Sequence, residues 1–392
     1  MSDLASAQAA DSTAVLTGTA TYREIAQQPE VWREAVRIVH KQRTELDDFL
    51  NHLLSRDDLR IVFTGAGTSA FIGEILVPAL RARLARRVEA IATTDLVSDP
   101  AAHFAEDVPT LLVSFARSGD SPESGAATDL ADRLLTEVGH LILTCNPDGG
   151  LCRAHRDRAD SLVLLMPARS DDEGFAMTSS FTAMLLSALL VFPGGNDAAV
   201  EPLAAAAGDV IRAIGRIESL VAGGPRRVVY LGSGPLTGLA RESALKLVEL
   251  TAGRVAAFHD SALGFRHGPK ALLDEETLAV VFVSSDPYRR LYDEDIVAEL
   301  RATMGADRVL AVSTQPLRSR AASDWVLSSL IGLEDAYLAP AYAVFAQLFA
   351  VYYAVRLGGT PDNPFPDGDV NRVVKGVRIH PLPEGSDRKA AR

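Results

Sequence analysis

The stretch IVFTGAG at residues 61–67 returns as VVYLGSG at residues 228–234, 167 positions further along the chain. Both are short apolar runs that end in a Gly-x-Gly turn, which is typical of a buried β-strand followed by a tight turn. A match at one fixed separation indicates a duplicated structural unit, so more strands with similar spacing are expected.

Four more pairs of apolar segments follow in the same order in the two halves of the chain. The pairs are 88–94 with 255–261, 111–115 with 278–282, 141–144 with 309–312, and 161–166 with 325–330. Helix-like stretches lie between them, such as residues 70–86 and 126–138. Strands that alternate with helices predict parallel sheets covered on both faces. The predicted fold class is therefore α/β, with two tandem doubly wound parallel-sheet domains of the flavodoxin-like kind.

The repeat predicts four consecutive parts. Residues 1–45 are expected to form a helical arm, because their apolar side chains recur at loosely helical spacing. Residues 46–214 and 215–360 hold the two sheets, and residues 361–392, rich in Pro, Asp and Gly, are expected to wrap back as a tail. Ligands of such sheets bind at the carboxyl ends of the strands.

The composition limits the possible classes of function. Hydrophobic residues make up 47% of the 392 positions and charged residues 23%, and no apolar run suggests a membrane span. A net charge of −12 without a basic stripe argues against nucleic acid as the main partner. Cys145 and Cys152 form neither a disulfide framework nor a zinc motif, and the amino terminus lacks a secretory pattern. A cytoplasmic protein that binds small molecules and copies of itself is expected.

Hydroxyl-rich turns follow the first and third strands of the first half. The turns read GAGTS at residues 65–69 and RSGDSP at residues 117–122, each at a junction of strand and helix that can bind an anion. Either turn could instead be a structural cap, since Ser121 ahead of Pro122 suits an N-cap. Two such turns on neighbouring strands favour a phosphate site. Its expected residues are Gly67, Thr68, Ser69, Arg117, Ser118 and Ser121.

The second half departs from the first at both turns. Its turns read GSGP at residues 232–235 and SSDP at residues 284–287. The first lacks the Thr-Ser pair, and the second lacks the glycine and carries an acid. One half is therefore expected to keep the phosphate site, while the other has diverged to a different role.

Three charged residues on one predicted helix of the second half are candidates for proton transfer. In the helix over residues 239–250, Glu242, Lys246 and Glu249 are spaced by four and three, so they share one face. The stripe can be interpreted as solvated ion pairs worth about 0.3–0.5 kcal/mol each. Because its neighbours are apolar, it can also be interpreted as facing a cleft, where a carboxylate could shuttle a proton.

Two further residues suit acid–base or carbonyl chemistry. His267 lies in a rigid His-Gly-Pro turn, and an imidazole with an ordinary pKa near 6.5 can exchange protons at neutral pH. His259, at the end of a predicted strand, is the competing histidine. Lys375 in the tail is the last candidate.

Together these motifs resemble the sugar isomerase (SIS) fold, and in particular the isomerase half of glucosamine-6-phosphate synthase. Three segments are similar to the AgaS branch of that family: TYREIAQQP at residues 21–29, SFARSG at 114–119 and FAMTSSF at 175–181. This branch is described as galactosamine-6-phosphate deaminase/isomerase, also named tagatose-6-phosphate ketose/aldose isomerase. The resemblance covers nearly the whole chain.

The resemblance implies roles for the candidate residues. The hydroxyl turns would hold the sugar phosphate, and Glu249 would move a proton between C1 and C2. His267 would assist ring opening in the active site of a neighbouring subunit, and Lys375 would attack the sugar carbonyl. Glu242 and Lys246 are counted with the substrate-binding residues. A homodimer or a dimer of dimers with shared active sites is implied, and no metal or redox cofactor.

Two departures from the synthase shape the expected reaction. A Ser-Gln pair is replaced by Ala116-Arg117, so contacts to the phosphate or the sugar are expected to differ. The sequence holds no glutamine-hydrolysing domain, so the proton transfer is expected to run as deamination. Galactosamine 6-phosphate would open, Glu249 would move the C2 proton to C1, and hydrolysis of the C2 imine would give tagatose 6-phosphate and ammonia.

Other functions stay open on sequence alone. The chain could be a plain aldose–ketose isomerase, or a deaminase of glucosamine 6-phosphate or of a fructosamine phosphate. A non-enzymatic sugar-phosphate sensor is disfavoured by the joint presence of Glu249, His267 and Lys375. Every enzymatic interpretation requires the serine-rich turns and the acid-bearing helix to act on one substrate. No single residue type encodes the preference at C4 of the sugar.

Overall fold

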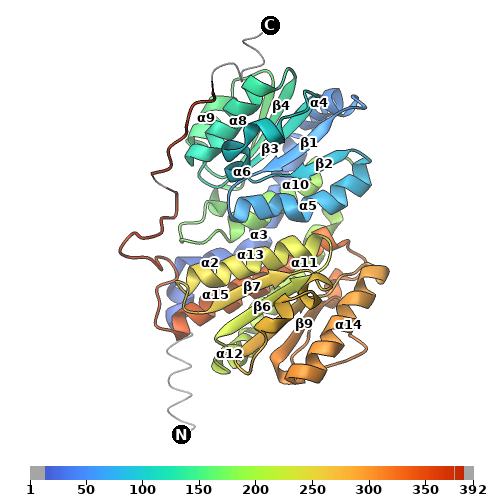
Figure 1. The fold of residues 1–392 in the computed structure, drawn as a ribbon, viewed down its shortest axis with the longest axis vertical. Helices are drawn as coiled ribbons and strands as arrows, with labels where there is room; N and C mark the ends of the chain where they lie inside the picture. Colours follow the sequence, from blue (N-terminus) through green and yellow to red (C-terminus); the bar gives the residue numbers. More distant parts are fainter. Residues whose placement is uncertain (1–13, 375, 384–392) are drawn as a thin grey trace. The chain divides into compact units, whose positions relative to one another are not determined.

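The structure is a computed structural model that describes residues 14–374 and 376–383. The chain forms two compact units, each built around one sheet (Figure 1). The first-sheet unit holds residues 33–171, 183–197 and the tail from Val370. The second-sheet unit holds the described residues up to Trp32, residues 172–182 and residues 198–369.

The first sheet has five parallel strands in the order β2-β1-β3-β4-β5. The strands are β1 (Arg60–Thr64), β2 (Arg87–Ala90), β3 (Thr110–Ala116), β4 (Val138–Thr144) and β5 (Ser161–Leu165). The helices that connect them are α5 (Thr68–Leu84), α6 (Thr93–Ser98), α7 (Pro100–His103), α8 (Pro122–Leu134) and α9 (Gly150–His155). Every residue of β1, β3 and β4 is buried, as expected for inner strands covered on both faces.

The second sheet repeats this topology in the order β10-β9-β8-β6-β7. Its strands are β6 (Arg227–Gly232), β7 (Ala256–Asp260), β8 (Thr277–Phe282), β9 (Val309–Ser313) and β10 (Trp325–Val326). Its helices are α11 (Val200–Arg212), α12 (Ile214–Ala222), α13 (Pro235–Leu250), α14 (Pro287–Met304) and α15 (Asp335–Arg356). In chain order both sheets run second, first, third, fourth, fifth, which is the flavodoxin-like order. The predicted fold class is confirmed.

The remaining helices precede or join these elements. They are α2 (Ala20–Ala26), α3 (Gln28–Lys41), α4 (Arg43–Leu54) and α10 (Ser179–Val191), with short 3₁₀ turns at η1 (Ala168–Ser170), η2 (Asp197–Ala199), η3 (Gly264–Arg266), η4 (Pro269–Leu272), η5 (Ala306–Arg308) and η6 (Ser328–Leu330). The described part of the predicted amino-terminal arm holds α2, α3 and the start of α4. The division into four consecutive domains stays a prediction.

Several predicted boundaries shift in the structure. The helix predicted over residues 239–250 already begins at Pro235, because proline suits the first turn of a helix. The helix predicted over residues 126–138 spans Pro122–Leu134, and Val138 instead opens β4, where it pairs with Thr110. The last predicted strand is only two residues long, Trp325–Val326, since η6 follows directly.

α15 is the central helix of the second-sheet unit. By length and composition alone it is the one described helix that could cross a membrane, but 94% of its most apolar window is buried inside the chain. It packs against α11, α12 and α13, which is the arrangement expected of a core helix.

The first described segment and the start of the tail are joined within the second-sheet unit. Asp362 accepts hydrogen bonds from the backbone N–H groups of Ala20 and Thr21, both at 2.8 Å, and from the Thr21 hydroxyl at 2.7 Å. A carboxylate at this position stabilises the amino terminus of α2, whose first N–H groups have no partner inside the helix.

Candidate active site

The turn after β1 is shaped by two glycines. A Cβ at Gly65 would lie 2.6 Å from the Cβ of Ser69, so only glycine lets α5 start this close to the strand. Gly67 has φ +54°, a conformation that favours glycine, and it stands directly before the helix. Thr68 and Ser69 therefore stand in the first turn of α5, at the helix end that favours an anion, although the N–H of Ser69 also donates to the carbonyl of Ala66 at 3.1 Å.

The second predicted turn follows β3, the neighbour of β1 in the sheet. Ser121 occupies the N-cap position of α8, but its hydroxyl lies 2.6 Å from that of Ser124 and does not cap the backbone. The Ser118 hydroxyl accepts a hydrogen bond from the N–H of Asp120 at 3.3 Å. Both serines are half-buried. The structure thus places both hydroxyl turns at the carboxyl edge of one sheet.

Arg117 makes a contact that sequence reasoning did not foresee. Its side chain is 6% exposed, and Nη2 donates to the backbone carbonyl of Arg372 in the tail at 3.0 Å. Arg372 in turn lies 3.7 Å from Asp171. The buried arginine therefore ties residue 372 of the tail to the turn after β3, inside the first-sheet unit. Lys375 lies outside the described residues, so its role stays a prediction.

The charged stripe on α13 lies in the second-sheet unit. Lys246 forms an ion pair with Glu249, and its Nζ lies 3.6 Å from Oε1 of Glu242. The side chains of Lys246 and Glu242 are 1% and 2% exposed, whereas that of Glu249 is 24% exposed. α13 packs against α15, β6 and β7, and this packing covers the first two charges. The solvated interpretation of the stripe is therefore wrong for Glu242 and Lys246.

A buried cation between two carboxylates has a clear chemical consequence. Charges removed from water are stable only when they are paired, so Lys246 and Glu242 fix each other in place. Glu249 shares the same lysine but still reaches solvent. It is the member of the set that can meet a ligand.

The two candidate histidines differ in setting. His267 is exposed, closes the 3₁₀ turn η3 and precedes Gly268, which has φ +125°. His259 lies in β7, and burial together with the nearby Arg241 lowers its pKa. The exposed imidazole of His267 is available to a ligand or to a neighbouring molecule, and its role stays a prediction.

Two acids in the second-sheet unit were missed by sequence reasoning. Asp172 is fully buried and accepts six hydrogen bonds, from the backbone N–H and the hydroxyl of each of Thr178, Ser179 and Ser180 at the start of α10. Glu24 accepts from the N–H groups of residues 173 and 174. Burial, reinforced by Asp172, raises the pKa of Glu24 to about 7. In the sequence, the signal for this site was the hydroxyl triplet of residues 178–180 at the start of the apolar helix α10.

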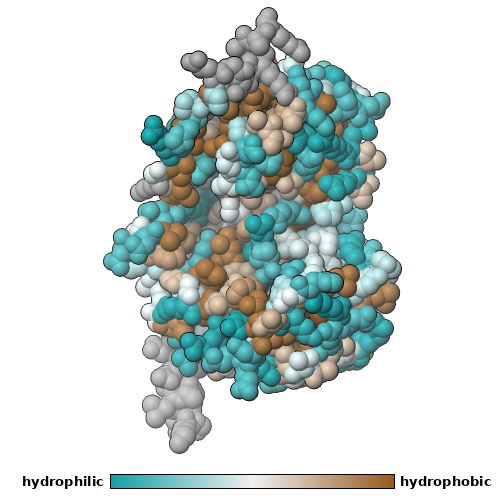
Figure 2. Space-filling model, viewed as in Figure 1, coloured by the Kyte–Doolittle hydropathy of each residue, from teal (hydrophilic) through white to brown (hydrophobic). Residues whose placement is uncertain are grey.

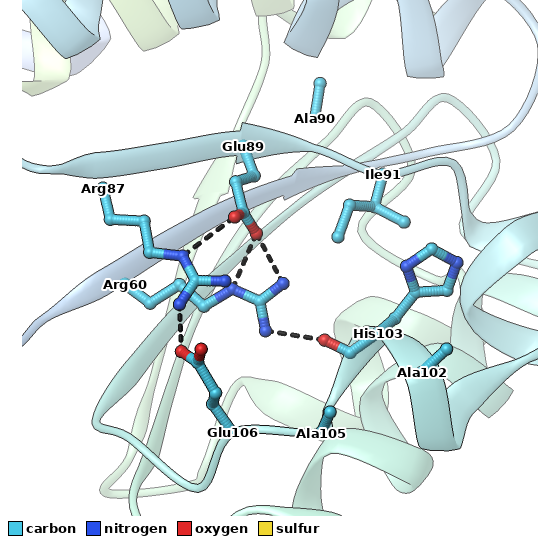
Figure 3. Close-up of a pocket in the computed structure, with 9 residues that line it drawn as sticks. All are labelled: Arg60, Arg87, Glu89, Ala90, Ile91, Ala102, His103, Ala105 and Glu106. Carbon is cyan, nitrogen blue, oxygen red and sulfur yellow. Dashed lines mark hydrogen bonds and ion pairs between the residues drawn. The ribbon is translucent and has the colours of Figure 1, made fainter.

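A pocket of about 380 Å³ in the first-sheet unit lies beside the edge strand β2 (Figure 3). Glu89 lies between Arg60 and Arg87 and accepts hydrogen bonds from both, and Arg87 also pairs with Glu106. The charges of the pocket are compensated by one another, and none of its lining residues was predicted as a site residue. This pocket is separate from the turns after β1 and β3.

The described residues contain no group of three or more His, Cys, Asp or Glu side chains placed to hold a metal ion. The two cysteines are buried free thiols. The candidate side chains and N–H groups can form hydrogen bonds to an anion, and a carboxylate or an imidazole among them can transfer a proton.

Comparisons with known proteins identify the family of the chain. The SIS domain model matches residues 53–192 and 224–356. An AgaS protein of Streptomyces coelicolor is 56% identical over 367 residues, which cover 92% of this chain and 95% of that protein. The D-galactosamine-6-phosphate deaminase AgaS of Escherichia coli is 46% identical over 376 residues, 94% of this chain and 97% of that protein.

A solved structure extends the match to three dimensions. The crystal structure of tagatose-6-phosphate ketose/aldose isomerase from Escherichia coli has a TM-score of 0.84 and 43% identity, covering 94% of this chain and 98% of that one. The two matched SIS segments contain the two sheets with the hydroxyl turns and α13. The resemblance seen in the sequence is confirmed, and the chain belongs to the SIS domain family, in its AgaS branch.

Proposed function

We propose that the protein is a deaminating isomerase that converts galactosamine 6-phosphate to tagatose 6-phosphate and ammonia. The structural observation that carries the proposal is the set of charges on α13, in which a buried lysine holds a carboxylate that remains accessible. Relatives that match over nine-tenths of this chain are named D-galactosamine-6-phosphate deaminases, which supports the choice of substrate.

The phosphate group is assigned to the turns of the first-sheet unit. Thr68, Ser69, Ser118 and Ser121 supply hydroxyls, and Gly67 lets the backbone N–H groups at the start of α5 approach an anion. Arg117 is assigned a supporting position, because its guanidinium already holds the tail.

Proton transfer is assigned to Glu249. After the ring opens, its carboxylate takes the proton from C2 and returns it to C1, which converts the 2-amino aldose into the C2 imine of the ketose. Water adds to C2, the C–N bond breaks, and ammonia leaves. Lys246 keeps Glu249 in place through the ion pair and is itself fixed by Glu242. His267 is assigned to ring opening and Lys375 to attack on the carbonyl, as the family resemblance implies.

We also propose that the cytoplasmic protein acts as a homodimer or a dimer of dimers, with His267 serving the active site of a neighbour. β7 is an edge strand without a fully buried residue, and its Phe258 is 37% exposed. Val248, which precedes the strand in the sequence, and Leu263, which follows it, are 37% and 47% exposed. Brown atoms lie over this part of the second-sheet unit in Figure 2. Exposed apolar groups next to an open strand edge favour burial against another copy.

Ammonia release from the purified full chain tests the reaction. Galactosamine 6-phosphate should yield ammonia and a ketose phosphate in equal amounts. Glucosamine 6-phosphate and a fructosamine phosphate, each at the same concentration, should react more slowly. Preference for glucosamine 6-phosphate would contradict the proposed substrate.

A plain aldose–ketose isomerase is the second candidate, favoured by the name of the similar solved structure. The same proton transfer by Glu249 would interconvert the hydroxy aldose and the ketose without loss of nitrogen. Ketose formation from galactose 6-phosphate, with no ammonia from any amino sugar phosphate, would support this alternative.

A further inference from the structure

The turns after β6 and β8 are the counterparts, in the second sheet, of the two hydroxyl turns. β6 and β8 are neighbours, as β1 and β3 are. Ser285 stands 167 positions after Ser118, the separation that relates the two halves. The second-sheet unit thus holds a turn that corresponds in position to the predicted phosphate turn and that also carries hydroxyls.

In this second pair of turns the donors are already taken by a carboxylate of the same chain. Asp335, the first residue of α15, is 3% exposed. It accepts hydrogen bonds from the hydroxyl of Ser284 at 2.6 Å and from the N–H of Ser285 at 2.7 Å. The Ser285 hydroxyl lies 2.9 Å from the same carboxylate and shares its proton with the carbonyl of Leu333 at 2.7 Å. Nη1 of Arg289 donates to the same carboxylate at 2.7 Å. Two hydroxyls, a backbone N–H and a guanidinium are the donors typical of phosphate sites.

A second buried acid completes the arrangement. Asp293 on α14 is fully buried, and its carboxylate accepts from the Ser233 hydroxyl and from the N–H of Ser284 at 2.8 Å. Ser233 belongs to the turn after β6, so both turns donate hydrogen bonds to carboxylates of the same unit. Burial raises the pKa of Asp293 to about 6, and Asp335 acts in the same direction.

Arg289 links the two turns. A Cβ at Gly234 would lie 2.5 Å from Nη1 of Arg289, so the guanidinium rests on the bare backbone of the turn after β6. In that place it reaches Asp335 and also lies 3.6 Å from Asp286. The arginine therefore covers the space in which an anion would meet the turns.

The first sheet differs at the corresponding point. The Ser118 hydroxyl accepts from a backbone N–H, and the Ser121 hydroxyl pairs with another serine. Within the described residues neither hydroxyl bonds a carboxylate. The two halves thus share a pair of turns. In the second half, the carboxylate of Asp335 accepts hydrogen bonds from the turn after β8.

We propose that the second-sheet unit contains a phosphate-type cradle occupied by the carboxylate of Asp335, and that removing this carboxylate makes the cradle bind inorganic phosphate. The carboxylate stands in for the oxyanion: it supplies negative charge and accepts the same four donors. The unmodified chain accordingly binds a single phosphoryl group, in the first-sheet unit. Removal of Asp335 leaves Ser285 and Arg289 without this acceptor, and a phosphate ion restores their hydrogen bonds.

The test measures binding of inorganic phosphate by titration calorimetry on the full chain. All variants carry Ser118→Ala and Ser121→Ala, which silence the first-sheet turns. In this background Asp335→Ala should add one phosphate per chain, with affinity about tenfold or more above that of the background alone. Adding Ser285→Ala and Arg289→Gln should remove the gain. The control is Asp295→Ala on α14, which deletes the same charge from a side chain that is 65% exposed and should leave phosphate binding unchanged.

A second measurement is needed because removal of Asp335 can destabilise the start of α15. The unfolding temperatures of Asp335→Ala and Asp335→Ser are compared in phosphate and in chloride of equal ionic strength. In either variant, a rise specific to phosphate that exceeds the rise of the Ser118→Ala and Ser121→Ala background alone supports the proposal. No binding by calorimetry and no such rise in either variant overturns it, as does an equal gain in Asp295→Ala. Because the readout is phosphate binding, the result is independent of the deaminase assay.

Discussion

The turns after β1 and β3 and those after β6 and β8 stand at the same edge of two sheets with the same strand order. In the first sheet, the hydroxyls of Ser118 and Ser121 bond, among the described residues, a backbone N–H and another serine. In the second, Asp335 and Asp293 take the hydroxyls of the turns. The same strand order therefore does not decide what the turns can bind. The deciding groups are acids that other elements bring to the turn.

The helices after the first strand of each half show the complementary difference. Glu242, Lys246 and Glu249 of α13 correspond, 167 positions earlier, to Ile75, Ala79 and Ala82 of α5. The half that holds the hydroxyl turns thus lacks the charges, and the half with the charges has its turns filled by carboxylates. Under the proposed function, the first half would bind the phosphate and the second half would transfer the proton.

The largest expected effect comes from the accessible acid of α13. Glu249→Gln should lower kcat by about 10²–10⁴, because the amide cannot accept the C2 proton. Binding of the sugar phosphate, measured by calorimetry on the inactive variant, should stay unchanged. The matched control is Glu275→Gln, an exposed acid between η4 and β8 of the same unit. A loss of turnover below threefold would assign the proton transfer to another group.

The next effect concerns the buried lysine. Lys246→Met leaves the carboxylate of Glu242 buried next to an apolar side chain and should destabilise the chain by about 3–5 kcal/mol. Lys270→Met provides the comparison, since Lys270 and its partner Glu299 are 31% and 35% exposed and should contribute about 0–1 kcal/mol. Urea unfolding of both variants measures the difference. Equal losses would mean that burial of the α13 set adds nothing to stability.

The two units are also expected to respond differently to acid. In the first-sheet unit, His155 is 1% exposed, its ring lies 4.8 Å from that of His140, and its Nδ1 meets the Ser161 hydroxyl at 2.9 Å. Burial, with help from His140 and Arg158, lowers the pKa of His155 to about 4. The unfolded chain then binds the proton more readily, so this contribution to stability is complete above pH 6.5 and is lost as the pH falls toward 4.

Glu24 and Asp293 of the second-sheet unit act in the opposite direction. Their raised pKa values, about 7 and about 6, mean that the folded chain binds these protons more readily, so stability rises as the pH falls from 7.

Because the pKa of His155 is lowered to about 4 in the folded chain, His155→Gln should reduce the loss of unfolding free energy between pH 6.5 and 4.5 by roughly 2 kcal/mol. The exposed His52→Gln should leave that loss unchanged. An identical pH dependence in both variants would exclude His155 as the source.

The smallest effect tests the hydroxyl turns directly. Ser118→Ala should raise KM for the sugar phosphate about tenfold through loss of one hydrogen bond to a charged group, with kcat little changed. Ser55→Ala, at the exposed end of α4, is the control. A KM equal to that of the parent would remove Ser118 from the phosphate site and weaken the contrast between the two halves.

The fold could be predicted because its signals are local and repeated. Apolar runs such as residues 61–64 and 111–115 are long enough to mark buried strands, and the fixed separation of 167 positions orders them. Glu242, Lys246 and Glu249 could be placed on one helix face for the same reason, since their spacing follows the helical period.

What could not be predicted depends on contacts between distant residues. Asp335 meets Ser285 across 50 positions, and nothing near either residue marks the pair. The burial of Lys246 was equally hidden, because it results from packing of α13 against α15, which begins at Asp335, 100 positions after Pro235 at the start of α13. Local patterns give the face of a helix, but tertiary packing decides whether water reaches it.

The carboxylate of Asp362 has a consequence for synthesis of the chain. It bonds the start of α2 from 341 residues away, so this helix has only its local Thr19 cap until residue 362 has been made. At about 5–20 residues per second, the interval is roughly 20–70 s. A chain that stalls before residue 362 would therefore hold the start of α2 by its Thr19 cap alone.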